Sequence, residues 1–147
     1  MSIEFFVEDV ILPCVDYEVV RKVLKAQLRK HKRRLGDINY IFCSDDYLLK
    51  LNVQFLKHNF YTDVITFDYS VENMVAGDIY VSIERVEDNS VCFDQIYINE
   101  LVRVISHGFL HLLRYGDKEY SEILEMRRME FVLLDQYLSL RDIGIVE

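Results

Sequence analysis

Two histidines one helical turn apart, and a carboxylate shortly after them, are the residues of this sequence best suited to chemistry. His107 and His111 lie in an apolar run, and Asp117 follows six residues after His111. Residues four apart on a helix share one face, so both imidazoles are expected to point the same way. Two imidazoles and a carboxylate, with a fourth position left for water, form a typical catalytic zinc site. The sequence therefore predicts a metal site at His107, His111 and Asp117.

A pair of core histidines without a metal is the alternative interpretation. A single histidine on an apolar helix face commonly donates one hydrogen bond to a backbone carbonyl and binds nothing else. Two imidazoles buried together without partners would be costly. The Gly116-Asp117 pair that follows supplies both a turn and an anionic ligand. This combination favours the metal site.

Three neighbouring residues are expected to support the site. Glu100 lies two helical turns before His107 and is a candidate to orient that imidazole through its second nitrogen; a capping or surface carboxylate is the alternative. Gly108 costs a helix about 1 kcal/mol relative to alanine, which is tolerated where another segment or a substrate comes close. Gly116 can end the helix with a positive φ and so turn Asp117 back.

The residue after the first histidine argues against a peptidase. In helical zinc proteases that residue is a glutamate that acts as general base, whereas here it is Gly108. Arg114 stands where the longer protease motif has a glycine. A metal-dependent peptidase or amidohydrolase is thereby disfavoured and is kept as an alternative.

Length and composition indicate one ordinary soluble domain. The chain has 147 residues, of which 51% are apolar and 29% charged, so residues 1–147 are expected to form a single domain with a sizeable core. No apolar run reaches the length of about 18 residues that a membrane span needs. The N-terminal residues are acidic where a secretion signal would be basic. We therefore expect a cytoplasmic protein with no membrane partner.

Cysteine usage agrees with a reducing compartment. Cys14, Cys43 and Cys92 are widely spaced, odd in number and not arranged as a Cys-x-x-Cys pair. Buried, reduced thiols are the expectation for such residues.

Charge is unevenly distributed along the chain. The net charge is −8, which argues against a protein that binds nucleic acid over its whole surface. Residues 21–34, however, contain eight arginines and lysines and no acidic residue. This basic strip could contact RNA phosphates, or it could be the solvated face of a helix.

The remaining pattern predicts about four strands and several helices. Runs rich in β-branched and aromatic residues indicate strands at residues 3–7, 38–43, 62–69 and 76–83, the last two forming a hairpin. Helical spacing and capping residues indicate helices from Asp16, from Ser44 or Asp45, at residues 84–89, at 93–113 with Asp94 as N-cap, and from 118 or 119 to about 140. The predicted fold is α+β, a small mixed sheet packed with helices, with the metal site on the central helix.

Four segments, taken in order, resemble the YbeY family of endoribonucleases. That family has a helical His-Gly-x-Leu-His-Leu followed by Gly-Tyr-Asp-His, together with Leu-Asn, Thr-Asp-Val-Leu-Ser-Phe and Gly-Asp-Ile segments. The similar segments here are residues 107–117, Leu51-Asn52, residues 62–67 and residues 76–82. The resemblance implies a single-strand-specific endoribonuclease of ribosomal RNA maturation, with RNA and the ribosome as partners.

Two departures from the family pattern concern the site itself. The family's third metal-binding histidine falls on Asp117, and a His₂-carboxylate set is still competent for zinc. The family's active-site arginine falls on Leu56. A substitute would have to come from Lys57, His58 or Arg114; His58 is the catalytic candidate, and a solvent-facing loop histidine is the alternative.

The predicted mechanism follows from these residues. One Zn²⁺ held by His107, His111 and Asp117 would lower the pKa of a water toward ~7 and polarise the scissile phosphate. The remaining alternative is a ribosome assembly or binding factor whose metal is structural. Such a site needs a fourth protein ligand, for which Asp63, Asp78 and Cys92 are the candidates.

Overall fold

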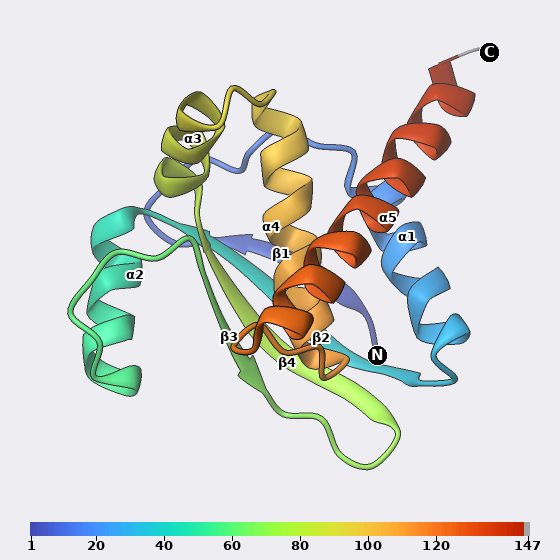
Figure 1. Cartoon of the computed structure of the whole chain (residues 1–147), viewed down its shortest axis with the longest axis horizontal. Coiled ribbons are helices and arrows are strands. Elements are labelled where there is room, and N and C mark those ends of the chain that lie inside the picture. The colour runs from blue at the N-terminus through green and yellow to red at the C-terminus, as the bar shows by residue number, and fades with distance from the viewer. Residues whose placement is uncertain (146–147) are drawn as a thin grey trace.

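Four strands form one mixed sheet in the computed structural model, which describes residues 1–145 (Figure 1). The strands are β1 (Ile3–Val7), β2 (Arg34–Cys43), β3 (Val64–Asp68) and β4 (Met74–Ser82). Their order across the sheet is β1-β2-β4-β3, with β1 and β4 parallel to β2 and β3 antiparallel to β4. The small mixed sheet and the β3–β4 hairpin confirm the predicted α+β class.

Helices connect the strands and cover the sheet. They are α1 (Tyr17–Lys30), α2 (Asp45–Leu51), a π-helical turn η1 (Asn52–Leu56), α3 (Ile83–Cys92), α4 (Tyr97–Leu112) and α5 (Tyr120–Ile145). In Figure 1, α4 lies across the sheet, and α5 and α1 lie beside it. None of the helices between residues 1 and 145 has the length and hydrophobicity that crossing a bilayer requires.

Side-chain caps fix where the first helices begin. The Asp16 side chain accepts a hydrogen bond from the backbone N–H of Val19 at 3.2 Å, as its position in the sequence predicts. Of the two candidates for the next helix, Ser44 is the cap, and it accepts from the N–H of Tyr47 at 3.1 Å. Each cap satisfies a backbone donor that the first helical turn leaves unpaired.

The central helix α4 is buried along most of its length. Its inner residues join the main core together with side chains from β2, β4, α1 and α5. The Tyr40 hydroxyl, fully buried on β2, donates a hydrogen bond of 2.8 Å to the backbone carbonyl of Ile105. A Cβ built on Gly108 would lie 2.6 Å from Cγ2 of Ile79 on β4. Gly108 therefore permits close packing of α4 on the sheet.

Three local expectations are wrong. The central helix begins at Tyr97 rather than at residue 93, because α3 continues to Cys92 and Asp94 takes a positive φ of 53° instead of capping a helix. Gly116 does not take the positive φ that ends α4; Arg114 does, with φ 73°. Of the three cysteines, only Cys43 is buried, while Cys14 and Cys92 are exposed.

Candidate metal centre

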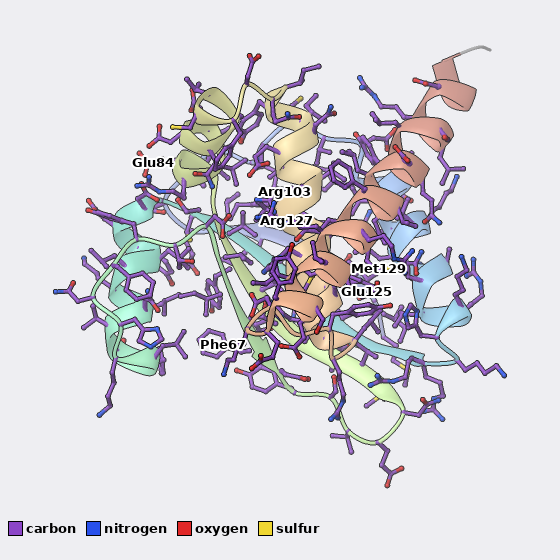
Figure 2. All side chains as sticks on the ribbon, in the orientation of Figure 1. Phe67, Glu84, Arg103, Glu125, Arg127 and Met129 are labelled. Atoms are coloured by element: carbon purple, nitrogen blue, oxygen red, sulfur yellow. The ribbon has the colours of Figure 1, made fainter. Side chains whose placement is uncertain are left out.

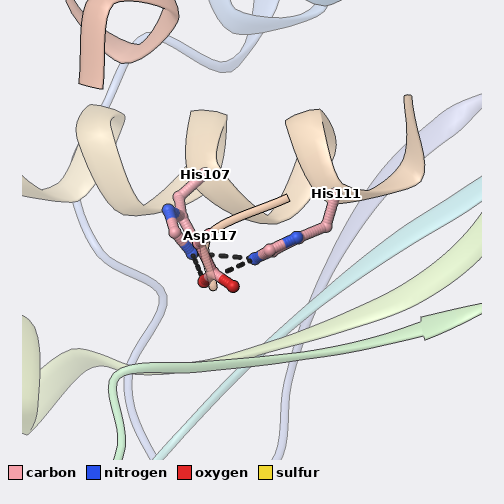
Figure 3. A group of neighbouring side chains, drawn as sticks. All are labelled: His107, His111 and Asp117. Carbon is pink, nitrogen blue, oxygen red and sulfur yellow. Dashed lines mark hydrogen bonds and ion pairs between the residues drawn. The ribbon is translucent and has the colours of Figure 1, made fainter. Parts of the chain in front are cut away.

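His107, His111 and Asp117 converge at one point beside α4 (Figure 3). The Nε2 atoms of the two histidines are 3.0 Å apart. One carboxylate oxygen of Asp117, Oδ2, lies 3.5 Å from Nε2 of His107 and 3.2 Å from Nε2 of His111. The two rings are nearly perpendicular, at 86°. The structure therefore brings together all three residues that the sequence assigns to a metal.

Two structural elements place these side chains. The four-residue spacing on α4 sets the imidazoles one turn apart on the same face. After the helix ends, the N–H of Tyr115 donates to the carbonyl of Leu110 at 3.0 Å, while Arg114 adopts its left-handed conformation. This closure is typical of helix C-termini. It reverses the chain so that Asp117 lies opposite the histidines.

A hydrogen bond at Nδ1 orients each imidazole. Nδ1 of His107 lies 2.6 Å from a carboxylate oxygen of Glu130, and Nδ1 of His111 lies 3.0 Å from the backbone carbonyl of Tyr115. Because both partners can only accept, each Nδ1 carries the proton and each Nε2 presents a lone pair to the centre. Two nitrogen lone pairs and a carboxylate thus face one another, an arrangement that a divalent cation satisfies.

Glu100, expected to orient His107, does not contact that ring. Its carboxylate accepts two hydrogen bonds from Arg103, at 2.8 and 2.7 Å. Arg103 also donates to Glu130 at 3.1 Å and lies 3.6 Å from Asp63. Glu130 performs the orienting role instead, and Arg103 holds it in place. The expectation for Glu100 is wrong because Arg103, which lies between Glu100 and His107 on the same helix, binds the Glu100 carboxylate.

Two pKa values are shifted among the side chains around Arg103. Hydrogen bonding to Glu100, followed by the charge of Glu130, raises the pKa of the Arg103 guanidinium further above its usual value. Burial raises the pKa of Asp63, although the nearby charge of Arg103 opposes this rise. One guanidinium therefore balances several carboxylates next to the candidate metal centre.

A cleft of about 570 Å³ opens onto the three converging residues. Its walls come from the segment that leads into β3, from β3 itself, from α4 and from the loop after α4. Leu56, at the position of the family arginine, lines this cleft, and so does the cationic Lys118. The Thr66 hydroxyl is buried there and has no hydrogen-bond partner in the described part of the chain.

The structure does not bring His58 into this cleft. Its ring is exposed and stacks on Phe60, with ring centroids 5.2 Å apart. It is not among the residues that line the cleft. Its catalytic role stays an untested prediction.

The three candidates for a fourth ligand lie outside the cluster. Among residues 1–145, the group that could share one ion contains only His107, His111 and Asp117. Asp63 is paired with Arg103, Asp78 accepts a hydrogen bond of 3.1 Å from Asn39, and Cys92 is exposed at the end of α3. Three protein donors leave an open position, which is the arrangement of catalytic zinc sites.

The supporting residues Glu130 and Arg103 did not emerge from the sequence. Glu130 comes from α5 and reaches His107 only because α4 and α5 pack together. One feature of the sequence points to Glu130. Its helical spacing places this carboxylate on the same buried stripe as Met126, Leu133 and Tyr137. A buried carboxylate on an apolar stripe indicates a partner on a neighbouring element.

Comparison with known proteins gives one consistent result. The family model "Endoribonuclease YbeY" matches residues 14–138. Similar proteins named Endoribonuclease YbeY occur in Parabacteroides distasonis, 42% identical over 83% of this chain and 86% of the relative, and in Cytophaga hutchinsonii, 44% identical over 95% and 96%. The fold resembles the solution structure of a Thermotoga maritima protein with a TM-score of 0.68 and 26% identity, covering 97% of this chain and 93% of the other.

Proposed function

Because the chain belongs to the YbeY family of endoribonucleases, we propose that it hydrolyses single-stranded RNA at the cleft beside α4, with Zn²⁺ held by His107, His111 and Asp117. Membership of this family makes the protein a nuclease and therefore a hydrolase. The observation that carries the site assignment is the convergence of three electron-pair donors at the floor of an open cleft. Ribosomal RNA is the proposed substrate, the ribosome the proposed partner and the cytoplasm the proposed location.

The residues of this chain divide the work of hydrolysis. When bound, Zn²⁺ supplies a nucleophilic water at neutral pH and polarises the scissile phosphate. Glu130 and the Tyr115 carbonyl hold the imidazoles so that both Nε2 atoms stay turned to the ion. Asp117 in place of a histidine adds a negative charge to this donor set, which admits harder metals more readily.

Lys118 is the cation that this chain offers to the phosphate. The position of the family arginine is occupied by Leu56 here. None of the three replacements that the sequence suggests lines the cleft: Lys57, His58 and Arg114 all lie outside its lining. Lys118, next to Asp117, does line it. A lysine at this position can neutralise one phosphate oxygen as a point charge, without the bidentate geometry of arginine.

The basic strip gives the RNA a path toward the cleft. Its side chains lie mostly exposed along α1 and the turn that follows it. At the end of α1, Nε2 of His31 is 2.8 Å from the hydroxyl of Tyr115, the residue whose carbonyl holds His111. The strip therefore ends beside the loop that carries Asp117. This arrangement supports contact with phosphates on the α1 side of the site.

The position of Gly108 argues against the peptidase alternative. A side chain at this position would point at Ile79 and Thr66 in the sheet. A glutamate there could not act on a substrate in the cleft without displacing β4. The assembly-factor alternative needs a fourth protein ligand, which the part of the chain from residue 1 to 145 does not bring to the cluster.

Metal analysis tests the proposed site. Purified protein is expected to contain zinc or a similar divalent metal, and His107→Ala and His111→Ala are expected to lose both the metal and the cleavage of single-stranded RNA. Asp117→His, which restores the family ligand, should retain the metal. His58→Ala serves as the control for metal content.

Two results would count against this function. Cleavage by protein that has been stripped of metal would contradict the mechanism. Loss of metal from Asp117→His, with metal kept by Asp117→Ala, would show that residue 117 does not bind the ion.

A further inference from the structure

A second pocket of about 510 Å³ adjoins the metal centre on the other side of Asp63. Its walls come from α3, the α3–α4 connection, α4, α5 and the segment that leads into β3. Figure 2 shows Arg103 on α4 and Arg127 on α5 in the region where these helices face each other, and both residues line the pocket. Its volume is in the range that binds small organic groups. Apart from Arg103 and Glu130, which support His107, the proposed mechanism uses none of the residues that line this pocket.

The two sites are structurally continuous. Asp63 lines both the pocket and the catalytic cleft. Glu130 also lines the pocket, and one of its carboxylate oxygens accepts a hydrogen bond from Nδ1 of His107. A strand of RNA whose phosphate lies at the metal centre therefore has an adjacent nucleotide within reach of the pocket.

Aromatic rings and amides give the pocket the chemistry of base recognition. Phe93 and Phe131 come from different elements and are 65% and 66% exposed, unusually high values for phenylalanine. Gln95, Asn89 and Asn99 add side-chain amides, which can both donate to and accept from the edge of a base. Single-stranded nucleic acids are bound by stacking on aromatic rings, with amides reading the base edges.

The charges of the pocket favour a neutral base over a phosphate. Three carboxylates line it, those of Asp63, Glu100 and Glu130, and all three lie close to Arg103. A phosphate inside would compete with these carboxylates for the same guanidinium. Arg127, exposed at the rim, remains the cation for the backbone of the same nucleotide.

We propose that this pocket binds the unpaired base of a nucleotide next to the scissile phosphate, with Phe131 and Phe93 as stacking surfaces. The proposal rests on the endoribonuclease function given above and adds a base-binding subsite to it. The pocket then selects single-stranded RNA, because a base in a duplex is stacked and paired and cannot enter.

The test combines one protein variant with one modified RNA. Phe131→Ala is expected to raise the Kd for a short single-stranded RNA by about tenfold, the loss of one stacked base. Removing the base from one nucleotide beside the cleavage site should cost wild-type protein a similar factor. Removing the same base should cost Phe131→Ala less than it costs wild-type protein, because part of the contact with the base is already gone. Fluorescence anisotropy read at the start of the reaction measures each Kd.

The control variant replaces a phenylalanine that lies outside the pocket. Phe6→Ala removes a half-exposed phenylalanine from β1, at the opposite edge of the sheet, and should leave Kd unchanged. If the losses from Phe131→Ala and from the abasic RNA multiply, the base binds elsewhere and the inference fails. If Phe131→Ala binds RNA as tightly as wild type, the pocket serves another partner and the inference also fails. Failure of the endoribonuclease function itself would appear separately, as absence of cleavage by wild-type protein.

Discussion

Both nitrogens of each imidazole at the candidate metal centre have a defined role. Nε2 faces the centre, and Nδ1 donates to Glu130 in His107 and to the Tyr115 carbonyl in His111. A charged acceptor at Nδ1 makes the opposite nitrogen a stronger donor of electron density to a metal. Glu130 is 4% exposed, so little water can replace it there. The two histidines are therefore not equivalent, and His107 depends on a side chain from another helix.

Replacing Glu130 by glutamine tests this dependence. Glu130→Gln keeps the shape and a hydrogen-bond acceptor but removes the charge, and should weaken zinc binding by roughly 10–100-fold. Competition with a chromophoric chelator measures the affinity. Glu125→Gln, on the same helix and paired with the exposed Arg128, is the matched control and should bind zinc like wild type. Equal affinities for both variants would show that Nδ1 of His107 needs no charged partner.

Among individual residues, the sequence predicts the three that converge at the site but not the residue from another helix that orients His107. His107, His111 and Asp117 are close in the chain, so helical geometry and one turn suffice to predict their proximity. Glu130 is brought to His107 by the packing of two helices, which no local pattern specifies. The turn itself was assigned to the wrong residue, because Arg114 rather than Gly116 takes the positive φ.

Among the secondary-structure elements, α4 positions the site through its close approach to the sheet. Gly108, the residue after His107, faces the sheet, and a Cβ there would lie 2.6 Å from Ile79 and 3.3 Å from both Thr66 and Val64. The absent side chain lets the helix settle against both β3 and β4. Because β3 also lines the cleft, this close packing holds the helix that carries both histidines against the cleft wall.

Gly108→Ala should therefore destabilise the protein even though alanine is the better helix former. Overpacking costs typically 1–3 kcal/mol, which exceeds the gain of about 1 kcal/mol in helix propensity. Thermal unfolding is expected to show a lower Tm for Gly108→Ala. Ser139→Ala, at an exposed position of α5, is the control and should unfold near the wild-type Tm. A raised Tm for Gly108→Ala would mean that α4 can move away from the sheet without cost.

Element types were predictable and element boundaries less so. Apolar periodicity and caps located α1 and α2 because their signals are local. The start of α4 was misplaced because Asp94 resembles an N-cap, whereas the chain there turns between two packed helices. The π-helical turn η1, which ends at Leu56, is a rare element, and the helical periodicity of this segment does not distinguish it from an α-helix.

Considered as a whole molecule, the protein is an acidic body with one basic strip. A net charge of −8 repels a polyanion at long range. The strip on α1 offsets this repulsion locally and ends close to the loop that carries Asp117. Binding of RNA should therefore depend strongly on salt.

Charge removal on the strip provides the measurement. The double variant Lys25→Gln, Arg29→Gln removes two exposed cations one helical turn apart. Each lost phosphate contact should reduce the slope of log Kd against log salt by about 0.7 for single-stranded RNA. Arg141→Gln, exposed on α5, is the control and should keep the wild-type slope. An unchanged slope in the double variant would assign the strip to the solvated face of a helix.

The short span of chain between His107 and Asp117 has a thermodynamic consequence. Because the three donors are neighbours in sequence, closing the loop between them costs little entropy even when the rest of the chain is unfolded. The denatured chain therefore retains part of its affinity for the ion. A ligand stabilises a fold only by the difference between its affinities for the native and denatured states. Metal removal should consequently lower Tm less than the native-state Kd implies, so a modest thermal shift on chelation is compatible with a tightly held ion.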